Sequence, residues 1–461
     1  MSEPTIHAIA RSIEAGERSC RDWVEFYLER IARADTRLRA VITPTTEAAR
    51  ATADRLDREL REGRRRGPLH GVPYGLKDVF DTAGVRTTAG SRLLLERVPD
   101  ADAAAVTSLT EAGAVLLGKL ETVEFCLGGP SDDGAFPPAA NPWNADCYAG
   151  GSSSGSGTAV AGGLMAFTLG TDTAGSVRLP ACFSGCTGFK PSAGRIDRRG
   201  IVRLSESLDE IGPLARSARD CALVLDALAG DIGAGMPATD AASWAARPRL
   251  DGLRIGFVRA HVEPYANAGV AAATSDAIDV FERLGAAIVD VDLPPLEDYT
   301  AAVLLISLAE AYALHRDWLA GRGLDYTRCT RQRISLGAFV DGADLADAYR
   351  QRQVLTSAWE GAFGGVDLLL SCGAFAGATP AKLVDAFYFL DQPLFGCAAN
   401  VAGAPSIAVP AGFDANDMPV GIQLSGPRGH DRRVLEAAHA FQGATPLLDR
   451  LPPLHATHLA D

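Results

Sequence analysis

The chain of 461 residues lacks an uninterrupted apolar run long enough to cross a bilayer as a helix. Its first residues, MSEPTIHAIARSIEAGERSC, also lack the apolar core that a secretory signal peptide needs. From both absences we expect a cytoplasmic protein with no membrane partner.

Basic residues are the minority among the charged ones. The sequence has 44 lysines and arginines against 57 aspartates and glutamates, so its formal net charge is −13. Nucleic-acid phosphates repel a chain with this balance. We therefore expect no nucleic-acid partner.

Paired cysteine spacing is absent as well. The nine cysteines are scattered, and neither a second pair nor a nearby histidine accompanies Cys182 and Cys186 as a zinc site would need. This pattern is typical of reduced, mostly buried thiols. It predicts no disulfide framework, and we expect neither a metal ion nor another cofactor.

Apolar residues, in contrast, are plentiful. They make up 47% of the chain, and charged residues make up 22%, which is typical of a globular protein with a sizeable core. Helical patterns alternate with strand patterns along the chain, for example a helix that begins after Ser19 and a strand in residues 71–80. This alternation predicts an α/β sheet covered by helices on both faces, and no linker divides the chain.

Residues 150–180, GGSSSGSGTAVAGGLMAFTLGTDTAGSVRLP, hold eight glycines and five serines. A P-loop would need a lysine after its last glycine, and a dinucleotide fingerprint would need a strand before it; neither is present. A loop that leads into a buried helix at residues 158–169 is a structural alternative. That alternative leaves residues 170–180 unexplained.

Two kinds of serine chemistry fit this segment. Residues 151–155 match the G-x-S-x-G nucleophile elbow with Ser153 at its centre, but no strand precedes them and no downstream histidine stands out. Alternatively, a serine can use a neutral lysine as its base. Lys77 lies in the apolar run GVPYGLKDVF, where burial would disfavour its ammonium form. An ion pair with Asp78 is the simpler explanation for this lysine.

Three blocks of the sequence together resemble the amidase signature family. They are GVPYGLKDVF, then AGGSSSGSGTAVAGG with LGTDTAGSVRLPACFSGCTGFKPS, and NVAGAPSIAVPAGFDANDMPVGIQLSG. The resemblance covers nearly the whole chain. It implies a single α/β/α domain over residues 1–461 with a mixed, mostly parallel sheet, and a variable, mostly helical pocket region at about residues 299–398.

The resemblance also implies a Ser–cis-Ser–Lys triad. Ser176 matches the nucleophile, Ser152 the serine with the cis peptide, and Lys77 the base. A proton would pass from Ser176 through Ser152 to Lys77, and Ser176 would attack the acyl carbon and form an acyl-enzyme. The backbone N–H groups of the loop would hold the oxyanion; this loop is Thr173, Ala174, Gly175 and Ser176.

Further residues follow from the same blocks. We expect the residues that support the triad to be Ser153, Thr171, Asp172 and Arg178, although the last two could also form an ordinary structural ion pair. Gly128 and Gly129 are candidates for the pocket lining. The segments CLGGPSDDGAFPPAANPW and LLLSCGAFAGATP depart from the family pattern at this pocket, so the family does not define the substrate.

The resulting hypothesis is a monomeric or homodimeric amidohydrolase of small aryl or alkyl amides, with carbamates, urethanes and esters as further substrates. A biuret- or allophanate-type hydrolase and the A-type subunit of glutamyl-tRNA amidotransferase are alternatives within the family. The divergent pocket segments favour a stand-alone amidase over that subunit. From another class, a non-catalytic scaffold that keeps the fold stays open.

Overall fold

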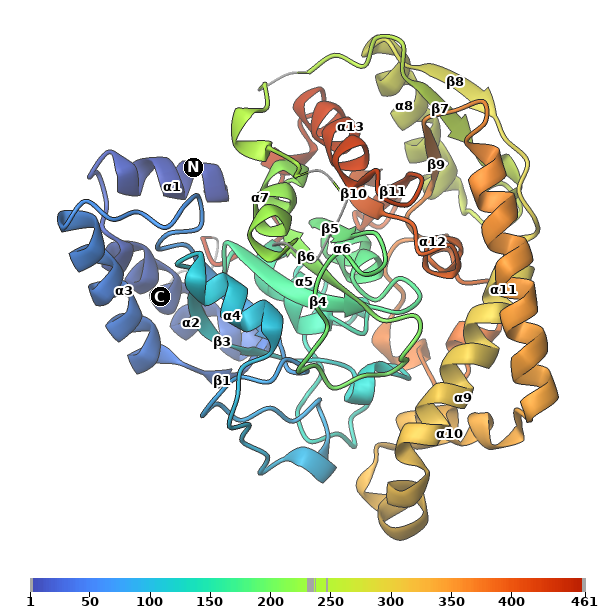
Figure 1. The fold of residues 1–461 in the computed structure, drawn as a ribbon, viewed down its shortest axis with the longest axis horizontal. Coiled ribbons are helices and arrows are strands. Elements are labelled where there is room, and N and C mark those ends of the chain that lie inside the picture. The colour runs from blue at the N-terminus through green and yellow to red at the C-terminus, as the bar shows by residue number, and fades with distance from the viewer. Residues whose placement is uncertain (1–2, 230–235, 237, 246–247, 458–461) are drawn as a thin grey trace.

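One sheet runs through the part of the chain that the computed structural model describes, residues 3–229, 236, 238–245 and 248–457 (Figure 1). Within these residues it has eleven strands in the order β1-β3-β2-β4-β6-β5-β10-β11-β9-β7-β8. The strands are β1 Val41–Pro44, β2 Pro73–Lys77, β3 Val115–Leu120, β4 Phe167–Asp172, β5 Thr187–Lys190, β6 Glu210–Ala215, β7 Arg254–Phe257, β8 Ala287–Asp290, β9 Leu368–Cys372, β10 Ser406–Phe413 and β11 Pro419–Ser425.

The sheet is mixed, as expected, but its centre is more antiparallel than the sequence indicated. Among the described strands, four neighbouring pairs are parallel and six are antiparallel. The parallel pairs lie toward the two edges. In the centre, β10 and β11 form a hairpin and no helix separates β5 from β6, and strands joined this closely run antiparallel.

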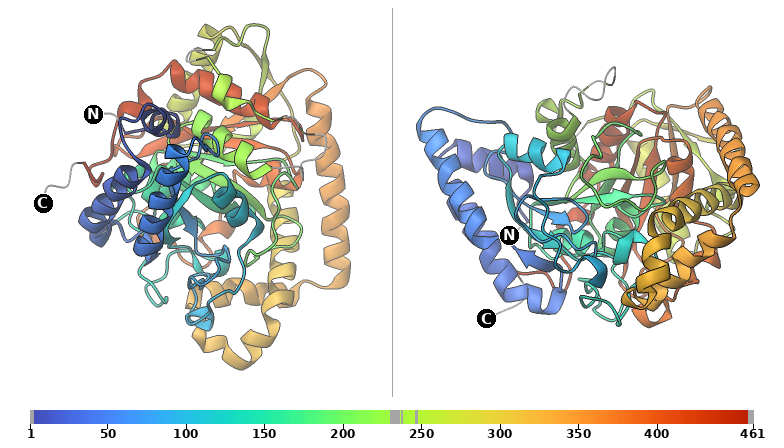
Figure 2. Two further views of the ribbon diagram at one scale, coloured as in Figure 1. Left: turned by 60° about the vertical axis from the view of Figure 1, so that its left-hand side comes forward. Right: turned by 60° about the horizontal axis from the view of Figure 1, so that its bottom comes forward.

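Helices cover the sheet. They are α1 Ile6–Glu14, α2 Cys20–Leu38, α3 Thr46–Arg61, α4 Ala104–Glu111, α5 Ser154–Ala161, α6 Arg178–Ser184, α7 Ala218–Ala229, α8 Ala268–Arg283, α9 Leu296–Arg322, α10 Arg328–Ser335, α11 Gly342–Ala362, α12 Cys397–Val401 and α13 Asp431–Gly443. Helices α1 to α3 lie beside the β1 edge, and the long helices α9 and α11 lie at the opposite side of the molecule (Figures 1 and 2).

Local sequence signals explain several of these elements. Ser19 caps α2: its hydroxyl accepts from the N–H of Asp22, and the Asp22 carboxylate accepts from the N–H of Ser19. The alternative prediction of a helix at residues 158–169 is wrong. Helix α5 ends at Ala161, because Gly163 takes a left-handed conformation at φ +72°, and β4 follows.

Helix α6, which directly follows the Ser176 loop, lies very close to the sheet. A Cβ atom on Gly188 of β5 would come within 2.7 Å of both the Ala181 Cβ and the Val177 carbonyl oxygen. Only glycine leaves room for this approach. The close packing fixes the start of α6 and, with it, the loop that carries Ser176.

The region at about residues 299–398 is helical only in its first part. Helices α9, α10 and α11 follow one another up to Ala362, where α11 ends, and β9 then pairs with β11 and β7 inside the main sheet. This pocket region is therefore continuous with the sheet. None of the helices that the structure describes is both long and apolar enough to span a membrane.

Candidate active site

Strands β3, β2 and β4 run parallel, and the candidate residues gather where the carboxyl ends of these strands meet. Strand β2 lies between β3 and β4, with Lys77 paired to Leu120 and Leu76 paired to Leu169. The carboxyl ends of parallel strands meet at the same edge, where active sites of α/β sheets gather. Lys77 is the last residue of β2 and is fully buried.

Lys77 contacts two hydroxyl groups. Its Nζ lies 2.7 Å from Ser152 Oγ and 2.8 Å from Thr171 Oγ1. The alternative ion pair with Asp78 is not formed, because the Asp78 carboxylate lies 3.4 Å from Nζ of Lys119, a second buried lysine. Lys77 is therefore directed at the serine-rich turn.

Ser152 is held by a turn with a cis peptide bond between Gly151 and Ser152. The Ser152 carbonyl oxygen accepts hydrogen bonds from Val123 N (3.1 Å) and Thr122 Oγ1 (2.9 Å). The adjacent Ser153 N donates to the carbonyl oxygen of Ser176 (3.2 Å), which joins the two turns. The turn thus fixes Ser152 between Lys77 and the loop of Ser176.

Ser153 has a different environment. Its side chain is fully buried and donates to the carbonyl oxygen of Thr171 at 3.3 Å, rather than to a histidine. The residues before it form turns, and α5 begins directly after it. The strand-to-helix geometry of a nucleophile elbow is therefore missing at Ser153.

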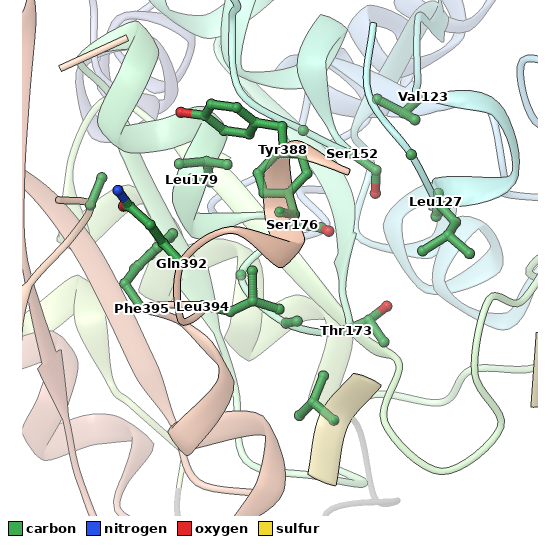
Figure 3. A pocket seen from close by; sticks show the side chains of 18 of the residues that line it. Val123, Leu127, Ser152, Thr173, Ser176, Leu179, Tyr388, Gln392, Leu394 and Phe395 are labelled. Atoms are coloured by element: carbon green, nitrogen blue, oxygen red, sulfur yellow. The ribbon is translucent and has the colours of Figure 1, made fainter. Parts of the chain in front are cut away.

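Ser176 is half-buried and lines the same pocket as Ser152 (Figure 3). In this part of the described chain no direct hydrogen bond joins the two hydroxyls. The adjacent Gly175 has φ +118°, and its N–H donates to Asp172 Oδ1 at 2.8 Å. We therefore remove Gly175 from the expected oxyanion donors, because its N–H already donates to Asp172 within the loop. The N–H groups of Thr173, Ala174 and Ser176 remain as candidates.

Asp172 and Arg178 form a fully buried ion pair behind this loop. Arg178 Nη2 lies 2.9 Å from Asp172 Oδ1, and Nε lies 3.0 Å from Oδ2. Arg178 also donates to Gln423 Oε1 at 2.7 Å and to the Asn400 side chain. Burial alone would raise the pKa of Asp172, but the Arg178 guanidinium outweighs it and holds that pKa well below its usual range.

Asp209, which no sequence motif indicated, also belongs to this site. Its carboxylate accepts from the Thr173 hydroxyl and from the N–H groups of Leu204 (2.8 Å) and Ser205 (3.1 Å). Burial raises the pKa of Asp209, although these donors act in the opposite direction. Its contacts hold Thr173 and the pocket residue Leu204 in place.

The pocket in front of the two serines has a volume of about 270 Å³. Most of the wall is apolar or aromatic, and Figure 3 labels Leu127, Leu179 and Phe395 on it. The wall also includes Tyr148, Phe183, Val303, Phe375 and Phe389. Gly128 lines it with φ +121° and contacts α10. Gly129 does not line the pocket. It is buried, and a Cβ atom added at this position would contact Val384.

Arg333 of α10 is the second residue that sequence reasoning missed. It lines the pocket, is only 3% exposed, and donates from Nη1 to the carbonyl oxygen of Ala386 at 3.2 Å. Its Nε has no hydrogen-bond partner, and no Asp or Glu among the described residues forms an ion pair with it. Burial lowers its pKa.

In the described ranges, no three histidine, cysteine or acidic side chains are grouped so that they could hold a metal ion. All nine cysteines are buried and free, as their scattered spacing predicts.

Several known proteins are similar to this chain over most of its length. A family model described as Amidase matches residues 22–435. The A-type subunit of glutamyl-tRNA(Gln) amidotransferase from Geobacter metallireducens is 36% identical and aligns over 96% of this chain and 97% of its own. Among solved structures, native peptide amidase from Stenotrophomonas maltophilia is 31% identical, with a TM-score of 0.84 over 95% of this chain and 96% of that one.

A second solved structure comes from a study of a vestigial protein complex and the evolutionary origins of an s-triazine catabolic enzyme. It is 32% identical, with a TM-score of 0.88 over 95% of this chain and 98% of that one. The family match and these relatives cover nearly the whole sequence. The chain therefore belongs to the amidase family, has the amidase signature fold, and is an enzyme that acts on carbon–nitrogen bonds.

Proposed function

We propose that this chain is an amidohydrolase of small amides that carry a carboxylate, and that it works through a Ser176 acyl-enzyme with Ser152 and Lys77 as the proton path. This substrate class is narrower than the aryl amides, alkyl amides and carbamates that the sequence allows. The observation that carries the proposal is the buried guanidinium of Arg333 in a mostly apolar pocket, whose lining also includes one acidic residue, Asp391.

The catalytic steps follow from the contacts of Lys77. Neutral Lys77 accepts the hydroxyl proton of Ser152, which in turn takes the proton of Ser176 as Ser176 Oγ bonds to the acyl carbon. The 2.7 Å contact of Lys77 with Ser152 supplies the first part of this path. The hydrogen bond between the two serines has to form when substrate binds. The proton returns through Ser152 to the leaving nitrogen, and water then hydrolyses the ester on Ser176.

The oxyanion develops next to the Ser176 loop. We assign its stabilisation to the N–H groups of Thr173, Ala174 and Ser176, since Gly175 donates to Asp172. Arg178 and Asn400 hold the Asp172 carboxylate in turn. These residues position the loop without contact to the substrate.

Arg333 supports the choice of substrate class. A buried charge is costly unless an opposite charge or several hydrogen bonds compensate it. The Arg333 Nε lacks a partner, and the planar guanidinium matches a carboxylate group well. A substrate carboxylate would supply the missing partner, whereas a neutral acyl chain would leave the guanidinium uncompensated.

The test compares succinic acid monoamide with butanamide, a neutral amide of the same chain length. We expect the wild-type enzyme to prefer the monoamide and Arg333→Met to lose about 10–100-fold in kcat/KM for it, because a hydrogen bond to a charged group contributes about 1.5–3 kcal/mol. The exposed Arg328 of the same helix provides the control Arg328→Met, which should keep the preference. Equal turnover of both amides by the wild type would contradict the proposal.

A second candidate function is that of a component of an amidotransferase. The 36% identity to the A-type subunit of glutamyl-tRNA(Gln) amidotransferase favours it, and glutamine also combines an amide with a carboxylate. The isolated chain separates the two candidates: hydrolysis of succinic acid monoamide without any partner supports the stand-alone enzyme. Activity that requires an added partner protein supports the amidotransferase role.

Two further alternatives have their own tests. Allophanate carries a carboxylate too, so an allophanate-type hydrolase agrees with the same substrate class. Biuret is neutral, so turnover of biuret in the substrate series would favour the biuret-type alternative. A non-catalytic scaffold would not react with a fluorophosphonate probe, whereas we expect labelling of Ser176. We propose a monomer or homodimer, which gel filtration with light scattering would test.

A further inference from the structure

The start of α10, the helix that carries Arg333, is bound to a short segment that follows β3. Glu124 of this segment has a buried side chain, and its Oε2 accepts a hydrogen bond from the N–H of Thr327, the N-cap of α10, at 2.8 Å. The hydroxyl of Ser91 donates to the other oxygen, Oε1, at 2.6 Å. Both oxygens of Glu124 are thus engaged, one of them with α10.

Two further contacts bind the first turn of α10 to the same segment. The hydroxyl of Thr330 donates to the carbonyl oxygen of Leu127 at 2.9 Å. A Cβ atom added to Gly128 would come within 3.3 Å of both Cys329 Sγ and Thr330 Oγ1, so the two backbones lie close together. Arg333 follows Thr330 by three residues and lies on the next turn of this short helix.

The other end of the segment holds the turn of Ser152. Thr122 Oγ1 and Val123 N donate to the Ser152 carbonyl oxygen at 2.9 Å and 3.1 Å. Val123 and Glu124 are neighbours in the chain, so the contact with this turn and the contact with α10 are one residue apart. Residues 122–128, which we call the bridging segment, therefore connect the serine-rich turn directly to the helix of Arg333.

We propose that Glu124 is a positioning residue that sets the chain length of the substrate. This inference rests on the proposed role of Arg333 as the group that binds the substrate carboxylate. Because Glu124 holds α10 on the bridging segment, Arg333 lies at a set distance from Ser176. A substrate then has to carry its amide and its carboxylate at a matching separation. Without the Glu124 contact, the buried N–H of Thr327 lacks its partner and α10 is held less firmly.

The test measures kcat and KM for the monoamides of malonic, succinic, glutaric and adipic acids. We expect the wild type to turn over one chain length best. Glu124→Gln has a single acceptor oxygen and cannot satisfy both donors. Its KM for the best monoamide should rise about 3–10-fold, as for one lost hydrogen bond, and the four chain lengths should become more alike. The fall in kcat should be much smaller than this rise in KM, because the lost interaction is one of binding.

Asp220→Asn is the matched control. The Asp220 carboxyl group makes the same two kinds of contact, with the N–H of Ile6 at the start of α1 and with the hydroxyl of Ser217, and it is buried as well. In the described chain, α1 contributes no residue to the pocket. This control should therefore lower stability and leave the chain-length profile of the wild type in place.

An unchanged chain-length profile in a folded Glu124→Gln variant overturns the proposal, and so does an equal flattening in Asp220→Asn. A wild type that prefers monoamides to butanamide but accepts all four chain lengths equally also overturns it. If Glu124→Gln does not fold, Ser91→Ala takes its place, because it removes one bond of the same carboxyl group without a change on α10. It should flatten the profile in part, and an unchanged profile overturns the proposal. If the wild type shows no preference for monoamides over butanamide, the proposed function itself fails, which is a separate result.

Discussion

Lys77 donates a 2.7 Å hydrogen bond to Ser152 Oγ, although the two residues are 75 positions apart in the sequence. The contact exists because β2 ends at Lys77 and the turn before α5 carries Ser152 to the same sheet edge. A buried amine that contacts a hydroxyl is the arrangement a serine hydrolase without histidine requires.

Lys77→Ala should therefore lose about 10²–10⁴-fold in amide turnover, the usual size of a general-base contribution. Ester turnover should fall less, because an alkoxide leaves with less need of a delivered proton. Parallel assays of an amide and an ester with the same acyl group measure the difference. The exposed Lys382, between β9 and α12, supplies the control Lys382→Ala, which should change neither rate. Near-normal amide turnover by Lys77→Ala would show that another group is the base.

Arg178→Met should destabilise the fold strongly. It leaves Asp172 as an uncompensated buried charge, and removal of one partner of a buried pair costs about 3–5 kcal/mol. Urea unfolding measures the change in the free energy of unfolding. Arg259→Met is the control, since its pair with Glu263 is exposed and such pairs contribute about 0–1 kcal/mol. Equal, small effects of both substitutions would contradict the structural importance of the Asp172 pair.

Asp220 should make stability depend on pH. Its carboxylate accepts from Ile6 N and from the Ser217 hydroxyl, but burial outweighs these bonds and raises its pKa to about 6. Between about pH 4 and 6 the folded state then binds more protons than the unfolded state, so this group's contribution to stability falls as pH rises.

The loss from Asp220 over this range should reach at most about 3 kcal/mol. Asp220→Asn removes this term, so the unfolding free energy of the wild type relative to the variant should decline from pH 4 to 6. Urea unfolding at several pH values gives this difference. A difference that is constant with pH, or one that grows, would be inconsistent with a raised pKa at Asp220.

Much of the fold could be predicted from the sequence because the signals were local. The capping pair Ser19 and Asp22 marks the start of α2, and alternating helix and strand patterns identify the α/β class. Residues 158–169 were harder, because both the end of α5 and the start of β4 are fully buried. An apolar run that is buried on every side has no periodicity to separate helix from strand.

The site was predictable only where the family motifs extend. Those motifs name Lys77, Ser152 and Ser176, whose catalytic roles remain predictions. Arg333 carries no such signal. Arg333 is one of three arginines in α10, and only tertiary packing buries it beside the pocket.

The most direct test of the proposed mechanism is to identify the residue that carries the acyl group. The enzyme would be quenched during turnover of an activated ester and digested, and the modified peptide would be sequenced by mass spectrometry. We predict the acyl group on Ser176, none in Ser176→Ala, and slower but detectable acylation in Ser152→Ala. An acyl group on Ser153, or acylation that persists in Ser176→Ala, would contradict the assignment of Ser176 as the nucleophile.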